Sequence, residues 1–300
     1  MSVRLGISPI GWSNDDLPEL GGATPLETCL AEARLAGFEG IELGNKFPRN
    51  PAVLRPILER HRLSLISGWY SGRLIERSIA EEMAAIEEHR ALLAAMGCAV
   101  LVYAETTGSI AGDRSRPLSS RPRLGDADWC DFGGQLSELA AHLSRLGIRL
   151  AYHHHMGTVV ENEAEIDRLM ATTSAAVGLL LDTGHLAFAG ADPARLAHRY
   201  AHRIVHVHCK DVRPGVLARV RAGDPSFLDA VLDGVFTVPG DGWIDFAEVL
   251  AALAAVHYVG WLVVEAEQDP VKAPPLAYAR LGFAHLASAA AHAGILREER

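Results

Sequence analysis

The chain has 300 residues, of which 49% are hydrophobic. This content supports a full apolar core and is too high for a disordered protein, and the length fits one large domain. The formal net charge at pH 7 is -9, and a surface of this charge repels phosphate backbones. General nucleic-acid binding is therefore not expected.

The cysteines and the N-terminus indicate the compartment. The cysteines are Cys29, Cys98, Cys130 and Cys209, and none form a CxxC pair. This pattern is typical of reduced, mostly buried thiols in a cytoplasmic protein. The N-terminal segment MSVRLGISPIGW lacks the apolar core of a signal peptide, and no apolar run approaches the length of a bilayer span. We expect a cytoplasmic protein without a membrane partner; the sequence is compatible with a homo-oligomer but does not fix the oligomeric state.

Short apolar runs alternate along the chain with longer segments of helical spacing. The runs occupy residues 3–8, 40–43, 63–67, 99–104, 148–153, 177–182, 204–208 and 261–265. Three amphipathic segments between them, at 24–37, 79–97 and 133–147, end in Gly37, Gly97 and Gly147. Glycine commonly ends a helix because it accepts the left-handed backbone there. The pattern predicts strands that alternate strictly with helices.

Such alternation with short connections predicts parallel strands covered by helices. Eight units in a chain of this length predict a single-domain (β/α)8 TIM barrel that spans residues 1–300. An open doubly wound sheet is disfavoured because LGISPIGW lacks the GxGxxG spacing. Two long loops, 105–129 and 212–243, each follow a strand, so we expect both over the C-terminal mouth of the barrel.

Polar side chains follow the strands where a TIM barrel places its active site. They are Glu42 on the second run, His153, His154 and His155 on the fifth, Asp182 on the sixth, His206 and His208 on the seventh, and Glu265 and Glu267 on the eighth. Because side chains alternate between the faces of a strand, residues two apart share a face. The inward face is therefore expected to carry stacked imidazole and carboxyl groups.

Several carboxylates in one mouth repel each other unless a positive charge neutralises them. A divalent cation does so, and Asp, Glu and His without a Cys ligand favour Mn²⁺, Co²⁺ or Zn²⁺. Each residue alone has a structural explanation: Asp182 as a helix N-cap, a strand histidine as a core residue. Their joint occurrence at successive strand ends favours a single site.

Other polar residues are weaker candidates. Trp12 and Asn14 either wall and bind a polyol or form a turn. Lys46, Lys210 and Arg213 either hold substrate oxygens or lie on a solvated rim.

The motifs YHHHMGT, LLLDTGH, HVHCKDVR, FTVPGDG and VVEAEQDP, after SPIGWSNDDLPELGG at the N-terminus, resemble the inosose dehydratases of myo-inositol catabolism over nearly the whole chain. These belong to the xylose-isomerase-like barrel superfamily. The resemblance implies a divalent metal, Mn²⁺ or Co²⁺, held at strands five to eight by Glu, Asp, His and Glu. It also implies a glutathione requirement, for which the sequence has no motif.

The resemblance transfers residue by residue, with one departure. Asp182, His208 and Glu265 match three of the implied ligands. The usual glutamate of strand five is absent, and His153 takes its place by position. His155, which shares the face of His153, and Glu161, in the loop that follows, remain alternatives.

The implied reaction removes water from 2-keto-myo-inositol, a cyclic polyol ketone, and gives a trihydroxycyclohexane-1,2-dione. The metal would bind the ketone and a neighbouring hydroxyl, while a base takes the α-proton and an acid protonates the leaving hydroxyl. Candidates for the acid and base are His155, Lys210 and Glu267, without an assignment among them. Substrate contacts are expected from Glu42, His154 and His185.

Three other functions remain open. A sugar-ketose epimerase or isomerase would share the metal and the enolate but return the proton. An endonuclease IV-like phosphodiesterase fits His185 after Asp182 but not the acidic surface. A non-catalytic polyol-binding barrel would bind the ligand without turnover.

Overall fold

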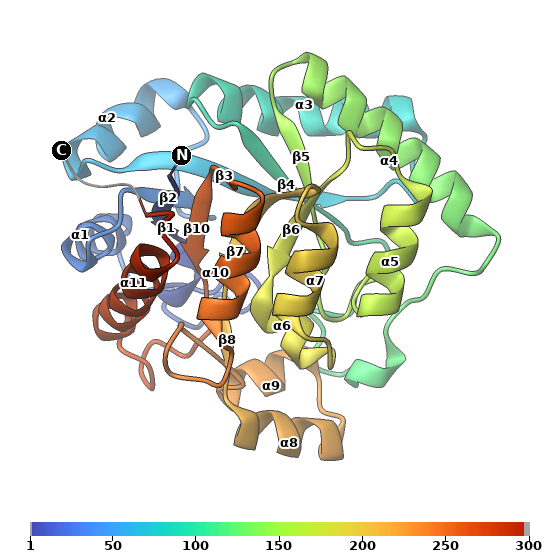
Figure 1. The fold of residues 1–300 in the computed structure, drawn as a ribbon. Coiled ribbons are helices and arrows are strands. Elements are labelled where there is room, and N and C mark those ends of the chain that lie inside the picture. The colour runs from blue at the N-terminus through green and yellow to red at the C-terminus, as the bar shows by residue number, and fades with distance from the viewer. Residues whose placement is uncertain (1, 297–300) are drawn as a thin grey trace.

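The computed structural model describes residues 2–296, and their strands form a closed parallel barrel with the order β1-β2-β3-β4-β5-β6-β7-β10. Figure 1 shows these strands at the centre of the molecule with helices around them. The predicted TIM barrel is confirmed. The barrel strands are β1 (Arg4–Ile7), β2 (Gly40–Leu43), β3 (Ser64–Gly72), β4 (Val100–Glu105), β5 (Arg149–His153), β6 (Gly178–Asp182), β7 (Ile204–Cys209) and β10 (Trp261–Val264).

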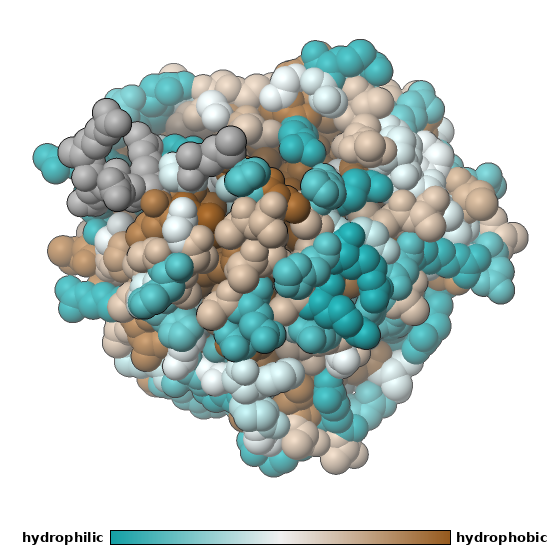
Figure 2. Space-filling model, in the orientation of Figure 1, coloured by the Kyte–Doolittle hydropathy of each residue, from teal (hydrophilic) through white to brown (hydrophobic). Residues whose placement is uncertain are grey.

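The helices cover the outside of the barrel, and the main apolar core lies between the two layers. The covering helices are α1 (Leu26–Ala36), α2 (Pro51–His61), α3 (Ile79–Ala95), α4 (Asp128–Arg145), α5 (Glu163–Thr172), α6 (Thr183–Phe188), α7 (Pro193–Tyr200), α10 (Phe246–Ala255) and α11 (Pro275–His292). No helix within residues 2–296 is both long and apolar enough to cross a bilayer. Polar residues cover much of the face in Figure 2, with apolar residues gathered in smaller areas between them.

Glycines inside the barrel make room for two large side chains. A Cβ at Gly6 would lie 2.5 Å from Ile66 Cδ1, and a Cβ at Gly40 would lie 2.4 Å from Ile66 Cγ2 and 2.8 Å from Trp261. Ile66 and Trp261 pack with Val263 in a small apolar cluster. Glycine at positions 6 and 40 therefore leaves room for Ile66 and Trp261 near the N-terminal ends of the strands.

Strand β3 is longer than the predicted run 63–67, because it continues through Gly68 to Gly72. The glycine interrupts the apolar run, but the backbone pairing with β4 continues from Trp69 to Gly72. A Cβ at Gly72 would lie 1.9 Å from Tyr103 Cζ, so glycine is needed where the two strands meet. The extension brings Trp69 and Ser71 to the mouth of the barrel.

The end of α4 permits a clean test of the predicted glycine stop. Gly147 has a φ of 82°, and a Cβ there would meet nothing within 4 Å. Gly147→Ala should lower the free energy of unfolding by about 1–2 kcal/mol, because alanine is strained in the left-handed region. The control, Gly134→Ala inside α4, also meets open space and should raise stability by up to about 1 kcal/mol. Urea denaturation measures both; equal midpoints would contradict the expectation.

The two long loops contain regular structure. Segment 105–129 carries a 3-10 turn, η2 (Leu118–Ser120), and segment 212–243 carries α8 (Pro214–Gly223), α9 (Phe227–Leu232) and a short ribbon of β8 (Asp211–Val212) with β9 (Phe236–Thr237). Helices α8 and α9 project from one end of the barrel at the bottom of Figure 1.

Hydrogen bonds and an ion pair connect segment 105–129 to segment 212–243. The Leu118 N–H donates to Pro225 O at 3.0 Å, and the Ser119 N–H donates to Asp224 Oδ1 at 2.9 Å. An exposed ion pair joins Arg114 to Asp229 at 2.6 Å. The contacts connect residues more than 100 positions apart.

Candidate metal and acid–base site

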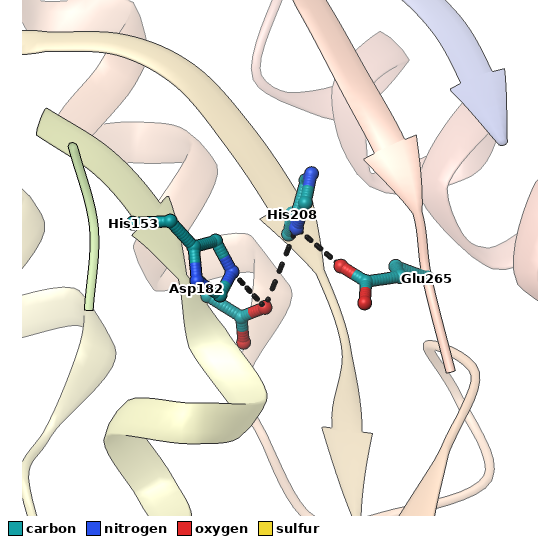
Figure 3. A group of neighbouring side chains, drawn as sticks. All are labelled: His153, Asp182, His208 and Glu265. Atoms are coloured by element: carbon teal, nitrogen blue, oxygen red, sulfur yellow. Dashed lines mark hydrogen bonds and ion pairs between the residues drawn. The ribbon is translucent and has the colours of Figure 1, made fainter. Parts of the chain in front are cut away.

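Side chains from consecutive barrel strands converge at the C-terminal mouth. His153, Asp182, His208 and Glu265 are all buried, and each offers a ligand atom within 4.8 Å of the others. Asp182 Oδ2 lies 3.3 Å from His153 Nε2 and 3.5 Å from His208 Nδ1. Figure 3 shows the four side chains pointing toward a common space.

Strand register explains this convergence. Asp182 of β6 lies beside His208 of β7, and Val263 of β10 lies on the other side of His208. Because side chains alternate along a strand, Glu265 faces the same way as Val263, into the barrel. His153 ends β5, directly before the neighbouring β6 in the barrel.

The donor set fits a divalent cation. His208 Nδ1 contacts Glu265 Oε2 directly and lies 3.5 Å from Asp182 Oδ2, so two carboxylates converge on one imidazole nitrogen. Burial lowers the pKa of His153 to about 4, although Asp182 opposes the shift, so this imidazole is neutral and able to ligate a metal. Two imidazoles and two carboxylates suit Mn²⁺, Co²⁺ or Zn²⁺.

A second polar group lies beside the first. Lys210 Nζ donates to Glu267 Oε2 at 2.5 Å and lies 3.0 Å from His185 Nε2 and 3.1 Å from Glu265 Oε1. Burial would lower the pKa of Lys210, but Asp182, Glu265 and Glu267 outweigh it and raise the pKa. Lys210 therefore carries the positive charge that faces these carboxylates.

Glu267 is ionised by its surroundings. Burial raises the pKa of its carboxyl group, but Lys210, His155 and His185 outweigh burial and hold the pKa well below the usual range. His155 Nδ1 lies 2.8 Å from Met156 O, and His155 Nε2 lies 3.8 Å from Glu267 Oε1. Burial lowers the pKa of His155, but Glu267 more than compensates and raises it.

An open cavity of about 420 Å³ lies over both groups, a size suited to a small molecule. His153, His155, His208, Glu265 and Glu267 line it, while Lys210 does not. Sequence reasoning singled out none of these other polar or aromatic lining residues: Asp15, Asp16, Asn45, Arg49, Trp69, Ser71, His89, Thr106, Ser109 and Thr158.

Trp69 forms an aromatic wall of this cavity. Its side chain is 39% exposed, and its ring lies edge-on to His153 and His155, with centroids 5.3 and 5.5 Å apart. A tryptophan between imidazoles and open space offers an apolar surface for the carbon skeleton of a polyol. The signal in the sequence was the dipeptide WY, one residue beyond the predicted third run and separated from it by Gly68.

Asp16 is another lining residue that the sequence did not reveal. Asn14 Oδ1 accepts hydrogen bonds from the N–H groups of Asp16 and Leu17 at 2.8 and 3.0 Å, which fixes a turn at the cavity mouth. Asp16 itself is exposed and belongs to the cavity lining. Asn14 therefore forms the predicted turn and lies outside the cavity lining, while Asp16 faces the cavity.

Trp12, Lys46 and Arg213 do not line the cavity. The Trp12 Nε1–H donates to Glu32 at 2.6 Å. Lys46 Nζ donates to backbone carbonyls between residues 21 and 24. Arg213 donates to the carbonyls of residues 234 and 236 and to Asp241. Their donors are engaged by the protein itself, and these three side chains lie outside the cavity lining.

Of the remaining predicted residues, His154, His185 and Glu161 lie outside the cavity lining and Glu42 belongs to it. His154 Nε2 accepts the Asp182 N–H at 3.4 Å, on the opposite face of the chain from His153. His185 Nδ1 accepts the Met156 N–H at 3.3 Å. Glu161 pairs with Arg121 at 3.2 Å and accepts the Gly157 N–H, so its carboxylate does not join the four-residue cluster. Glu42 lines the floor of the cavity, where it contacts His208.

The sequence has close relatives over nearly its full length. It is 53% identical to the rhizopine catabolism protein MocC of Rhizobium meliloti, over 98% of this chain and 90% of the relative. It is 47% identical to an inosose dehydratase of Geobacillus thermodenitrificans, over 92% and 94% of the two chains. An inosose dehydratase of Bacillus thuringiensis is 46% identical, over 93% and 94%.

Solved structures share the fold at low identity. An L-ribulose 3-epimerase superposes with a TM-score of 0.69 at 18% identity, over 97% of this chain and 96% of that one. The IolI protein with a bound zinc atom gives a TM-score of 0.63 at 14% identity, over 97% and 98%. Residues 30–289 also match the sequence profile of the xylose isomerase-like TIM barrels. The resemblance inferred from the motifs is thereby confirmed: the chain belongs to the xylose isomerase-like TIM barrel family and, within it, to the family of the inosose dehydratases.

Proposed function

We propose that this chain is a metal-dependent inosose dehydratase that acts in the cytoplasm on 2-keto-myo-inositol and gives a trihydroxycyclohexane-1,2-dione. The inosose dehydratases at 46–47% identity support the reaction. One structural observation carries the chemistry: a four-donor cluster lies beside a Lys210–Glu267–His155 group, and members of both line one cavity of small-molecule size.

His153, Asp182, His208 and Glu265 would hold the cation. A divalent ion there would polarise the ketone and a neighbouring hydroxyl and stabilise negative charge on the ketone oxygen. Mn²⁺ or Co²⁺ follows from the family resemblance, and Zn²⁺ is compatible with the same donors. The implied glutathione requirement stays a prediction, because no contact of the described residues accounts for it.

The acid–base roles follow from which groups reach the cavity. Glu267 and His155 line it, so they can touch substrate, whereas Lys210 is fully buried and holds the Glu267 carboxylate. Glu267 accepts the proton α to the ketone, and the C–H electron pair forms the enol double bond. The enolate electrons then re-form the carbonyl and shift the C=C bond while the C–O bond to the β-hydroxyl breaks with its electron pair, and His155 protonates the departing hydroxyl to give water. The hydroxy-enone that remains tautomerises to the 1,2-dione.

Incubation of the purified protein with the inosose and Mn²⁺ tests this proposal. Loss of water and the absorbance of a dione are expected. Deuterium uptake from D₂O without water loss would indicate the epimerase or isomerase instead. Ligand binding that survives chelation, without turnover, would indicate a polyol-binding protein. Cleavage of abasic DNA would indicate the phosphodiesterase.

Asp16→Asn tests the wall of the cavity. A hydrogen bond to a charged group contributes about 1.5–3 kcal/mol, so removal of the Asp16 charge should raise KM on the order of 10- to 100-fold. Metal affinity should not change, because Asp16 lies outside the four-donor cluster. Steady-state kinetics and metal titration measure the two effects. The control is Glu19→Gln, at an exposed position close in sequence and outside the cavity lining. An unchanged KM for Asp16→Asn would show that Asp16 does not contact the substrate.

A further inference from the structure

Glu42 of β2 contacts His208 on the side of the imidazole opposite the four-donor cluster. A single carboxylate oxygen, Oε1, receives three donors. The Ser67 hydroxyl donates at 2.5 Å, His206 Nε2 lies at 2.9 Å, and His208 Nε2 lies at 3.1 Å. The sequence predicted a substrate contact for Glu42, but this oxygen is occupied by side chains of the protein.

The two ring nitrogens of His208 face different partners. Nε2 faces Glu42, whereas Nδ1 faces Asp182 and Glu265. Figure 3 shows one ring nitrogen turned toward these two carboxylates and the other turned away. An imidazole that ligates a metal through one ring nitrogen carries a hydrogen only on the other. A carboxylate can only accept, so a hydrogen bond to Glu42 places that hydrogen on Nε2 and leaves the lone pair on Nδ1.

We propose that Glu42 is a positioning residue for the metal centre, which fixes the orientation and tautomer of His208 so that Nδ1 is presented to the cation. This inference rests on the proposed function only in requiring that the cluster binds a divalent metal. A carboxylate that accepts the second N–H of a ligating histidine both orients the ring and makes it a stronger donor to the metal.

Glu42 is itself held from two further strands. Ser67 lies on β3 and His206 on β7, so the carboxylate spans the interior of the barrel. Glu42 is 7% exposed and lines the cavity over the four-donor cluster. His206 lines a second cavity of about 370 Å³ at the N-terminal ends of the strands. The Glu42–Ser67–His206 network is thus the layer between the two cavities, and hydrogen bonds fix its geometry.

Metal titration of the chelated protein with Mn²⁺ or Co²⁺ tests the proposal, with Glu42→Ala and Glu42→Gln compared to the unaltered chain. Loss of such an outer partner typically costs about 10- to 100-fold in metal affinity, and we expect this for Glu42→Ala. Glu42→Gln should lose less, because its amide oxygen can still accept the Nε2–H. The visible spectrum of the Co²⁺ form should change in Glu42→Ala, since one ligand is no longer held in place.

Glu105→Gln is the matched control. Glu105 is another buried glutamate on a barrel strand, but it accepts from Leu74, Tyr103 and Thr107 and does not join the cluster. This variant should lose thermal stability without losing metal affinity. A purely structural role of Glu42 would give the same result.

The outcomes separate the two proposals. If the unaltered chain binds Mn²⁺ or Co²⁺ and both Glu42 variants bind it equally well, the positioning role is overturned and the proposed metal dependence stands. A higher KM with unchanged metal affinity would instead indicate that Glu42 contacts the substrate, as predicted from the sequence. If the unaltered chain binds neither ion, the metal dependence and the positioning role are both overturned. Should Glu42→Ala fail to fold, Glu42→Gln still decides the question by its metal affinity and Co²⁺ spectrum.

Discussion

Asp182→Asn is expected to abolish turnover and to weaken Mn²⁺ or Co²⁺ binding by on the order of 100-fold or more, since even the loss of an outer-shell partner costs about 10- to 100-fold. The fold should survive, because the two carboxylate oxygens have separate tasks. Oδ1 accepts the His185 N–H at 2.8 Å and caps α6, and an asparagine oxygen can do the same. Oδ2 faces His153 and His208, and in the variant this position carries an amide without a charge.

Chelation of the unaltered enzyme should reproduce the loss of turnover, and added Mn²⁺ or Co²⁺ should restore it. Metal titration, kinetics and thermal denaturation after chelation measure the effects. Asp192→Asn is the matched control: Asp192 caps α7 through Ala194 and Arg195 and is absent from the four-donor cluster. Full activity of the chelated enzyme, or of Asp182→Asn, would show that the reaction has no metal at this position.

Glu267→Gln is expected to lower kcat by about 10²- to 10⁴-fold, the usual contribution of a general acid or base. Glutamine can still accept the hydrogen bond from Lys210 Nζ, but it cannot take up a proton at neutral pH. Metal affinity should stay the same, because Glu267 does not belong to the cluster of His153, Asp182, His208 and Glu265. The measurement is kcat with metal at saturation, together with a metal titration.

Glu161→Gln is the control for this change. Its carboxylate is tied to Arg121 and the Gly157 N–H, so both kcat and metal affinity should be retained. A loss of metal affinity in Glu161→Gln would indicate that Glu161, in the loop after β5, is the fourth metal ligand in place of His153. A normal kcat in Glu267→Gln would transfer the role of base to His155.

The fold and the convergence of the cluster followed from local patterns in the sequence. Parallel strands expose their last residues at one end of the barrel, and a period of two sets which of those residues share a face. These rules suffice to bring Asp182, His208 and Glu265 together. They also separate His153 from His154, which turns to the other face and accepts the Asp182 N–H.

The rest of the cavity depends on loops, where neither rule applies. Asp16 and Lys46 are both polar residues near the N-terminus, and nothing in their spacing tells which one faces the cavity. In the structure three backbone carbonyls gather around Lys46, whereas the turn fixed by Asn14 presents Asp16. Trp69 was not predicted as a wall of the cavity, because Gly68 interrupts the apolar run and the continuation of β3 beyond it was not recognised.

The mutual contacts of segments 105–129 and 212–243 have a consequence for protein engineering. Ser109 and Ala111 of the first segment line the cavity, which makes that segment an attractive one to exchange between relatives when a new substrate range is sought. Transplanted alone, it would lose the partners that Pro225, Asp224 and Asp229 now provide. The two stretches are best treated as one exchangeable cassette, and chimeras should carry both from the same parent.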